Sequence, residues 1–138
     1  MKKLLGIVVL GLFLSGNVYA EPVHFLCKKN KKLFSDGEYP LMVDIDKKKM
    51  MRVSTDYEMQ VSEGYLTGIN KLSKSSRIII VLNRYNLELN VNFYRDNSFD
   101  FDNSYKTTCR KVDKQIWQSS KVIIISTLNV YPAIKEQI

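Results

Sequence analysis

Two pairs of aspartates have a spacing that could serve acid–base chemistry. Asp44 and Asp46, like Asp100 and Asp102, lie two residues apart in segments with strand-like patterns. Residues two apart on a strand point to the same face of a sheet, so each pair could present two carboxylates side by side. Glycosidases place two carboxylates about 5–9.5 Å apart across a cleft, which is close to that separation. Strands also expose alternate aspartates simply to water, and we interpret both pairs as solvated residues.

The single histidine, His24, gives little basis for hydrolytic or metal chemistry. A catalytic triad needs a base that a third group holds against a nucleophile, and nothing near His24 suggests one. Zinc needs about four Cys, His or acidic ligands at close spacing, which this chain cannot supply. The segment DFDNSY resembles the start of a calcium loop, but Ser104 and Tyr105 replace an oxygen ligand and the turn glycine. We predict no enzyme activity, no metal site and no cofactor.

The first twenty residues predict a secretory signal peptide. Lys2 and Lys3 form a basic start, residues 4–14 form an apolar segment, and Val18-Tyr19-Ala20 leads to a cut after Ala20. The apolar segment has about eleven residues, too few to cross about 30 Å of hydrocarbon as a helix. We therefore expect a periplasmic or secreted protein that has no transmembrane span after cleavage.

Export would place the two cysteines, Cys27 and Cys109, in an oxidising compartment. An even pair of cysteines in such a compartment usually forms a disulfide. The bond would close a loop of roughly 80 residues, which destabilises the unfolded state by about 4.5 kcal/mol in the chain-entropy model. We predict a Cys27–Cys109 disulfide that joins the two ends of the folded body.

Strand patterns dominate the chain after residue 20. Short alternating segments such as VHFLC, LMVDID and YEMQV are separated by Asp, Asn, Gly and Ser, and RIIIVLN is an apolar run typical of a strand buried on both sides. This pattern predicts an all-β domain over residues 21–112, an antiparallel sandwich or small barrel of about 7–9 strands. One domain with one core fits this length.

Residues 113–138 form a C-terminal extension with a second dense apolar run, KVIIIST. An unpaired run of this kind is prone to aggregation. We expect it to add a strand to the sheet, with burial against another chain or a short packed helix as the alternatives.

The charge of the processed chain is moderately positive. Loss of Lys2 and Lys3 leaves 19 basic residues against 14 acidic ones, a net charge of +5. A cationic exported protein meets anionic glycans, lipid headgroups or acidic proteins more readily than nucleic acid, and we expect no nucleic-acid partner. The one charge run is either an anion-binding patch or a set of edge lysines that keep the sheet soluble; it contains Lys28, Lys29, Lys31 and Lys32.

The segment LNRYNLELNVNFY is the most regular strand pattern. Glu88, Asn90 and Asn92 alternate with apolar residues, and we interpret this polar row as facing water. In a closed barrel the apolar row would line the interior and hold an apolar ligand if the core left a cavity. The residues predicted to line that cavity are Leu87, Val91, Phe93 and Ile79.

The segments HFLCKKN, LNRYNLEL and YKTTCRKV together resemble small exported bacterial proteins with no assigned function. In these proteins a strand reading L-N-R-x-x-x-x-L precedes a final cysteine strand, and the likeness covers residues 23–112. HFLCKKNKKLF is also similar to the opening Tyr-x-Cys strand of C-type lysozyme inhibitors, which are small exported β-barrels with a disulfide joining their two ends. The Ser-Gly-rich loop that those inhibitors insert into the enzyme cleft is not found in this sequence.

The sequence thus favours an exported, non-enzymatic binding or envelope-associated protein. One alternative is an inhibitor of a cell-wall hydrolase, which would bind through a loop or the basic patch. The other is a carrier of a small apolar ligand in a barrel interior. The expected partner is accordingly an envelope protein, a glycan or a small apolar ligand.

Overall fold

The computed structural model describes residues 21–30 and 37–130. The predicted signal peptide, Lys31 and Lys32 of the predicted basic patch, and the end of the predicted extension, residues 131–138, lie outside the described residues.

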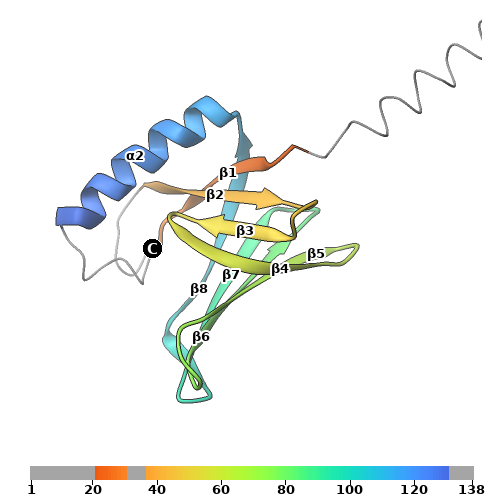
Figure 1. The fold of residues 1–138 in the computed structure, drawn as a ribbon, viewed down its shortest axis with the longest axis vertical. Helices are drawn as coiled ribbons and strands as arrows, with labels where there is room; N and C mark the ends of the chain where they lie inside the picture. Colours follow the sequence, from red (N-terminus) through yellow and green to blue (C-terminus); the bar gives the residue numbers. More distant parts are fainter. Residues whose placement is uncertain (1–20, 31–36, 131–138) are drawn as a thin grey trace, which may run out of the picture.

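Eight antiparallel strands close into a barrel (Figure 1). Each strand pairs with its neighbours in the chain, and β8 pairs back to β1. The all-β prediction is confirmed, and of its two alternatives the barrel is the one formed. The strands are β1 (Val23–Lys28), β2 (Glu38–Asp44), β3 (Lys49–Arg52), β4 (Thr55–Val61), β5 (Tyr65–Lys71), β6 (Arg77–Asn83), β7 (Glu88–Arg95) and β8 (Ser98–Val112).

Lys114–Val130 form helix α2, which begins just after β8. Asp113 caps it, because its Oδ1 accepts a hydrogen bond from the backbone N of Ile116 at 2.9 Å. The strand predicted for residues 113–138 is therefore wrong over this segment. In the closed barrel β8 already pairs with both β7 and β1, so it offers no free edge to a further strand. The helix instead packs over β1 and β2, where Trp117 is 5% exposed.

The core consists of the side chains on one face of each strand, which point into the barrel and fill it. Ile80 of β6 lies opposite Val91 of β7, and both side chains are fully buried. The intervening residues Ile79 and Val81 are only half-buried. The prediction that RIIIVLN is buried on both sides is therefore wrong, since the helix covers β1 and β2 and leaves the outer side of β6 facing outward.

The predicted disulfide is confirmed. Cys27 of β1 and Cys109 of β8 lie opposite each other in register, and their sulfurs are bonded at 2.02 Å. The bond therefore links the first and last strands across the seam that closes the barrel.

Candidate functional site

The barrel interior is filled with side chains. A Cβ added to Gly68 would lie 2.9 Å from Met50 Sδ and 3.0 Å from both Ile80 Cγ1 and Tyr57 Cβ. Such close approaches leave no spare room around this glycine, since non-bonded carbon atoms prefer about 3.5–4.0 Å. Most residues that line the clefts on the described surface lie at the ends or on the outside of the barrel, and the core residue Tyr57 contributes to one of these clefts.

The residues predicted to line a ligand cavity occupy different positions. Val91 and Phe93 lie in the packed interior, and Leu87 is half-buried against the same core. The prediction for Ile79 is wrong, because it pairs with Asn92 on the outward side of the wall. An uninterrupted apolar run carries no alternation that could show which of its residues point inward.

The predicted lysine patch is only partly described. Lys28 ends β1 and Lys29 follows it, and both line a groove of about 600 Å³ together with Lys106 and Thr107. Lys106 Nζ lies 2.7 Å from Glu88 Oε2, so part of the positive charge in this groove is already neutralised. The Thr107 hydroxyl donates to the backbone oxygen of Lys28 at 2.8 Å. Anion binding at this groove stays a prediction.

The first aspartate pair and His24 take up structural contacts. Asp44 Oδ1 accepts a hydrogen bond from the backbone N of Lys47 and so supports the turn between β2 and β3. Asp46, its neighbour in the predicted pair, is exposed in that turn. The His24 ring lies edge-on to Trp117 of α2, with the ring centroids 4.9 Å apart.

The second aspartate pair lies in an irregular part of β8. Val91 of β7 pairs with Tyr105, whereas Phe93 pairs with Asp100, so residues 101–104 bulge out opposite a single residue of β7. Such a bulge bends a strand and redirects its side chains. Asp102 lies in this bulge and is exposed, while Asp100 lies just before the bulge.

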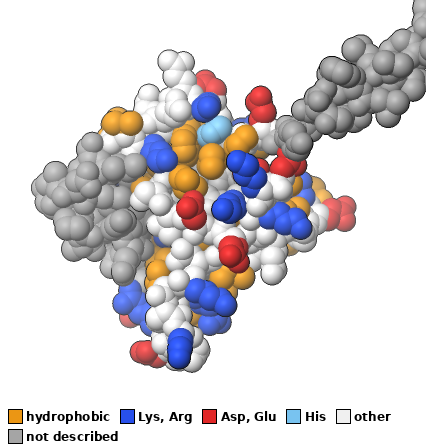
Figure 2. Space-filling model, in the orientation of Figure 1, with side chains coloured by type: hydrophobic (Ala, Val, Ile, Leu, Met, Phe, Trp, Pro, Cys, Tyr) orange, Lys and Arg blue, Asp and Glu red, His pale blue; other side chains and the backbone are white. Residues whose placement is uncertain are grey.

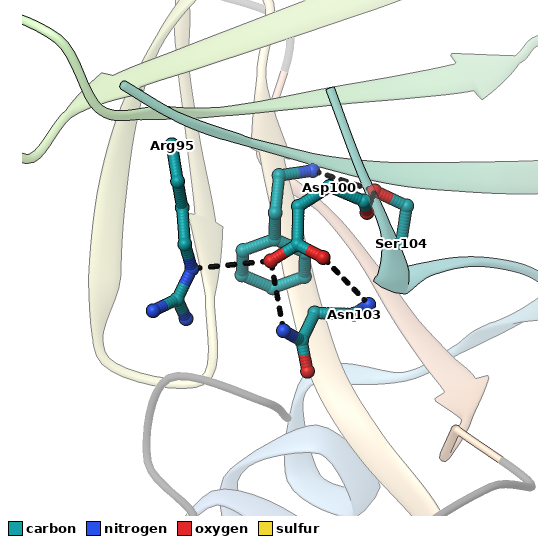
Figure 3. A network of polar contacts seen from close by, with 5 residues as sticks. Arg95, Asp100, Asn103 and Ser104 are labelled. Atoms are coloured by element: carbon teal, nitrogen blue, oxygen red, sulfur yellow. Dashed lines mark hydrogen bonds and ion pairs between the residues drawn. The ribbon is translucent and has the colours of Figure 1, made fainter. Parts of the chain in front are cut away.

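Hydrogen bonds around Asp100 fix the shape of the bulge (Figure 3). Asn103 donates to both carboxylate oxygens, from Nδ2 at 2.8 Å and from its backbone N at 3.3 Å. Arg95 Nε lies 3.2 Å from Oδ2, and the Ser104 hydroxyl donates to the Asp100 backbone oxygen at 2.6 Å. The hydrogen bond from Asn103, with the nearby Arg95 charge, lowers the pKa of Asp100.

A ladder of aromatic rings lies on the outer face beside this network. The Tyr94 and Phe99 rings are 5.5 Å apart and the Phe99 and Phe101 rings 4.5 Å apart, each pair edge to face. Arg77 places its guanidinium carbon 4.5 Å from the Tyr94 ring centroid, a cation–π arrangement. The last ring is the most open, because Phe101 is 77% exposed.

The neighbouring β5–β6 hairpin adds basic and apolar groups. Leu72 is 51% exposed and shares a shallow hollow with Lys71, Lys74 and Arg77. The hairpin is tied to the β7–β8 turn by a 2.8 Å hydrogen bond from Asn97 N to the Ser75 backbone oxygen. Figure 2 shows basic, acidic and hydrophobic side chains together at this lower end of the molecule. We call this region the tip surface; it consists of Lys71, Leu72, Lys74, Arg77, Tyr94, Phe99 and Phe101.

Sequence reasoning missed the tip surface because its parts are separated along the chain. Arg77 comes from β6, Tyr94 from β7 and Phe99 from β8, and only strand pairing places them in one row. A signal was present in FDFD, whose two phenylalanines alternate with aspartates and therefore have to share a face.

Sequence reasoning also missed a buried cation. Arg52 is 3% exposed and lies opposite Leu41, so it points into the barrel. Its Nε donates to Tyr57 Oη at 3.0 Å, whereas its buried Nη1 has no hydrogen-bond partner. The signal that could have found it is the alternation of MMRVS, which places Arg52 on the same face as Met50.

No family model, curated protein or solved structure matches the chain. Within residues 21–30 and 37–130, no three His, Cys, Asp or Glu side chains are grouped so that they could hold a metal ion. The same part of the chain contains no helix with the length and apolar character needed to cross a bilayer.

Proposed function

We propose that the chain is an exported, non-catalytic binding protein that associates with the cell envelope through its outer surface. The observation that carries the proposal is the tip surface, where Phe101 is 77% exposed beside Phe99 and the Arg77–Tyr94 stack. Large apolar groups exposed together on a soluble domain commonly mark a binding site.

The rigidity of the tip supports a binding role. The Phe101 bulge is held by hydrogen bonds from Asn103 and Ser104, and the ring is packed against Phe99. A surface that is ordered before binding loses less conformational entropy when a partner arrives. The exposed Phe101 ring is therefore fixed in position before a partner binds.

The filled interior favours an outer binding surface over a carrier. Val91 and Ile80 are fully buried and face each other inside the barrel, and Gly68 is crowded by its neighbours. An apolar ligand would have to displace this packing, whereas a partner at the tip surface would not.

Cell fractionation tests the proposal. The wild-type protein is expected to fractionate with the envelope, and the double variant Phe99→Ser/Phe101→Ser is expected in the soluble exported fraction. Tyr85→Ser is the matched control, because Tyr85 is 75% exposed in the β6–β7 turn, at the other end of β7 from the tip surface. A wild-type protein found in the soluble fraction, or a double variant that stays with the envelope, would overturn the proposal.

A second candidate is an inhibitor of a cell-wall hydrolase. The feature that favours it is a closed barrel with a disulfide between its first and last strands, the architecture that the similarity to C-type lysozyme inhibitors implies. A turbidity assay of lysozyme on bacterial cell walls tests it: the inhibitor would slow clearing, and an unchanged rate at excess protein would exclude it.

A further inference from the structure

We infer that the partner of the tip surface is the anionic headgroup layer of a phospholipid bilayer. This inference rests on the proposed function and adds to it the chemistry of the partner. It is carried by two independent features, the charge of the β5–β6 hairpin and the shape and exposure of the aromatic ladder.

The β5–β6 hairpin carries charge of one sign, whereas the adjoining β7–β8 turn and bulge contain Asp96, Asp100 and Asp102. Residues 64–87 contain no Asp or Glu, but they contain four basic residues. Three of these, Lys71, Lys74 and Arg77, belong to the tip surface. Each Lys or Arg close to an anionic leaflet strengthens binding about fivefold. The hairpin is therefore matched to a surface of dense negative charge.

The apolar groups are placed for shallow insertion. Leu72 is 51% exposed and lies beside Lys71 and Lys74, whose long stems let the charge remain at the headgroup level, and Phe101 is 77% exposed beside Phe99. Aromatic rings beside cationic side chains are the composition of interfacial membrane-binding surfaces. The tip surface thus has a basic side on the β5–β6 hairpin and an aromatic side on β8, where Asp102 is also exposed.

The shape of the region favours a flat partner over a peptide or a folded acidic protein. Lys71, Arg77, Tyr94 and Phe99 form one outward row across four neighbouring strands, which spans about 15 Å at the usual strand spacing. The tips of the two hairpins are joined and stand away from helix α2 (Figure 1). Because these joined hairpin ends project from the barrel, they can approach a plane before helix α2 meets it.

Vesicle co-sedimentation tests the inference with the exported, processed protein. The probes are vesicles of phosphatidylcholine alone and of phosphatidylcholine mixed with phosphatidylglycerol. Binding is expected only to the second kind and is expected to weaken as salt is added, because salt screens exposed charges. Lys71→Gln/Lys74→Gln should bind roughly 25-fold more weakly, from two losses of about fivefold.

The matched charge control is Lys47→Gln/Lys48→Gln, in the β2–β3 turn, where both lysines are exposed. That turn lies at the opposite end of the strands from the β5–β6 hairpin, as the strand order requires. If this control loses as much affinity as Lys71→Gln/Lys74→Gln, binding depends only on net charge and the assignment to the tip surface is overturned.

A fluorescence measurement tests insertion separately from charge. Phe101→Trp places an indole at the tip, while the native Trp117 is buried against the barrel and supplies a constant background. With anionic vesicles the new indole should shift to the blue and be quenched by brominated acyl chains, and Tyr85→Trp should show neither change. Equal responses from the two positions would overturn insertion at the tip.

The outcomes separate this inference from the proposed function. If the tip variants leave the envelope in cells but the wild type binds neither kind of vesicle, the partner is a protein or a glycan; the lipid inference then fails and the proposed function stands. If tip variants remain with the envelope, the proposed function fails, whatever the vesicles show.

Discussion

The Arg52 guanidinium lies inside the barrel among tyrosine side chains. Tyr57 accepts its Nε hydrogen, and the Tyr39 and Tyr57 ring centroids each lie 5.9 Å from its Cζ. Tyr39 in turn shares a 2.9 Å hydrogen bond with Tyr105, and burial raises the pKa of Tyr39 well above its ordinary value. Burial thus favours the neutral form of Tyr39 beside the Arg52 guanidinium, whose hydrogen bond to Tyr57 satisfies one of its buried N–H groups.

Removing the Tyr57 hydroxyl should destabilise the fold. Tyr57→Phe leaves the Nε–H of a buried cation without an acceptor, which costs about 1.5–3 kcal/mol. Tyr65→Phe is the control, because Tyr65 is 50% exposed and its loss should cost less than about 0.5 kcal/mol. Denaturant unfolding measures both variants, and equal midpoints would contradict this role for the hydroxyl.

Gly68 shows how tightly the interior is packed. Gly68→Ala places a methyl group 2.9 Å from Met50 Sδ, and over-packing of this kind costs about 1–3 kcal/mol. At Gly64 the nearest atom to an added Cβ is Tyr85 Cε2 at 3.5 Å, so Gly64→Ala should be close to neutral. Thermal unfolding of the Gly68→Ala and Gly64→Ala variants measures the difference in stability between them. A neutral Gly68→Ala would mean that the core has spare volume, and it would reopen the carrier hypothesis.

At the scale of elements, helix α2 is joined to the barrel through a small aromatic contact. Trp117 lies against His24 of β1, and Lys121 Nζ lies 5.1 Å from the Trp117 ring centroid. The cleft around His24 is lined by charged groups of both signs, namely Glu21, Lys111, Asp113 and Lys114. Burial, and then the Lys114 charge, lower the pKa of His24 below 6.5.

This contact predicts a pH dependence of stability. The unfolded chain, with an ordinary His24 pKa near 6.5, binds the proton more strongly than the folded chain does. The free energy of unfolding should therefore fall as the pH drops through and below about 6.5. Urea unfolding at about pH 7.5 and about pH 5.5 brackets the histidine range.

The control for the pH prediction is His24→Gln, which removes the titrating ring. The loss of stability between the two pH values should be smaller in this variant than in the wild type. An unchanged loss would assign the effect to other groups and would sink the prediction for His24.

The tip surface is also an effect of elements rather than of single residues. Phe101 lies at the start of the β-bulge at residues 101–104, and pairing of β6, β7 and β8 brings Arg77 and Phe99 to either side of Tyr94. Helix α2 lies over β1 and β2, away from this row. The two ends of the fold thus differ: helix α2 packs against the barrel at one end, and the side chains of the tip surface are exposed at the other.

At the scale of the whole molecule, the disulfide closes the barrel seam. Removing it in Cys27→Ala/Cys109→Ala frees the unfolded chain from an 82-residue loop. The free energy of unfolding should fall by about 2–5 kcal/mol. Denaturant unfolding measures the change, and mass spectrometry without reductant confirms the bond in the wild type. A variant as stable as the wild type would show that strand pairing alone secures the seam.

Several features were predictable because they depend on local pattern or on residue count. Two-residue alternation in segments such as YEMQV predicts strands whatever the fold, and an even pair of cysteines after a predicted signal peptide predicts a bond. Both predictions are confirmed. By contrast, Ile79 lies in an unbroken apolar run, in which no alternation shows which residues point inward. Only its pairing with Asn92 shows that Ile79 points away from the barrel interior.

The amino-acid sequence by itself determined the all-β class and the partner of each cysteine, because strand period and thiol count are properties of the chain. Tertiary structure decided the rest. Closure of the barrel left β8 without a free edge, so the apolar segment after it became a helix, and the register of β3 turned Arg52 inward. Pairing of strands far apart in the chain likewise assembled the tip surface, because which side chains become neighbours depends on which strands meet.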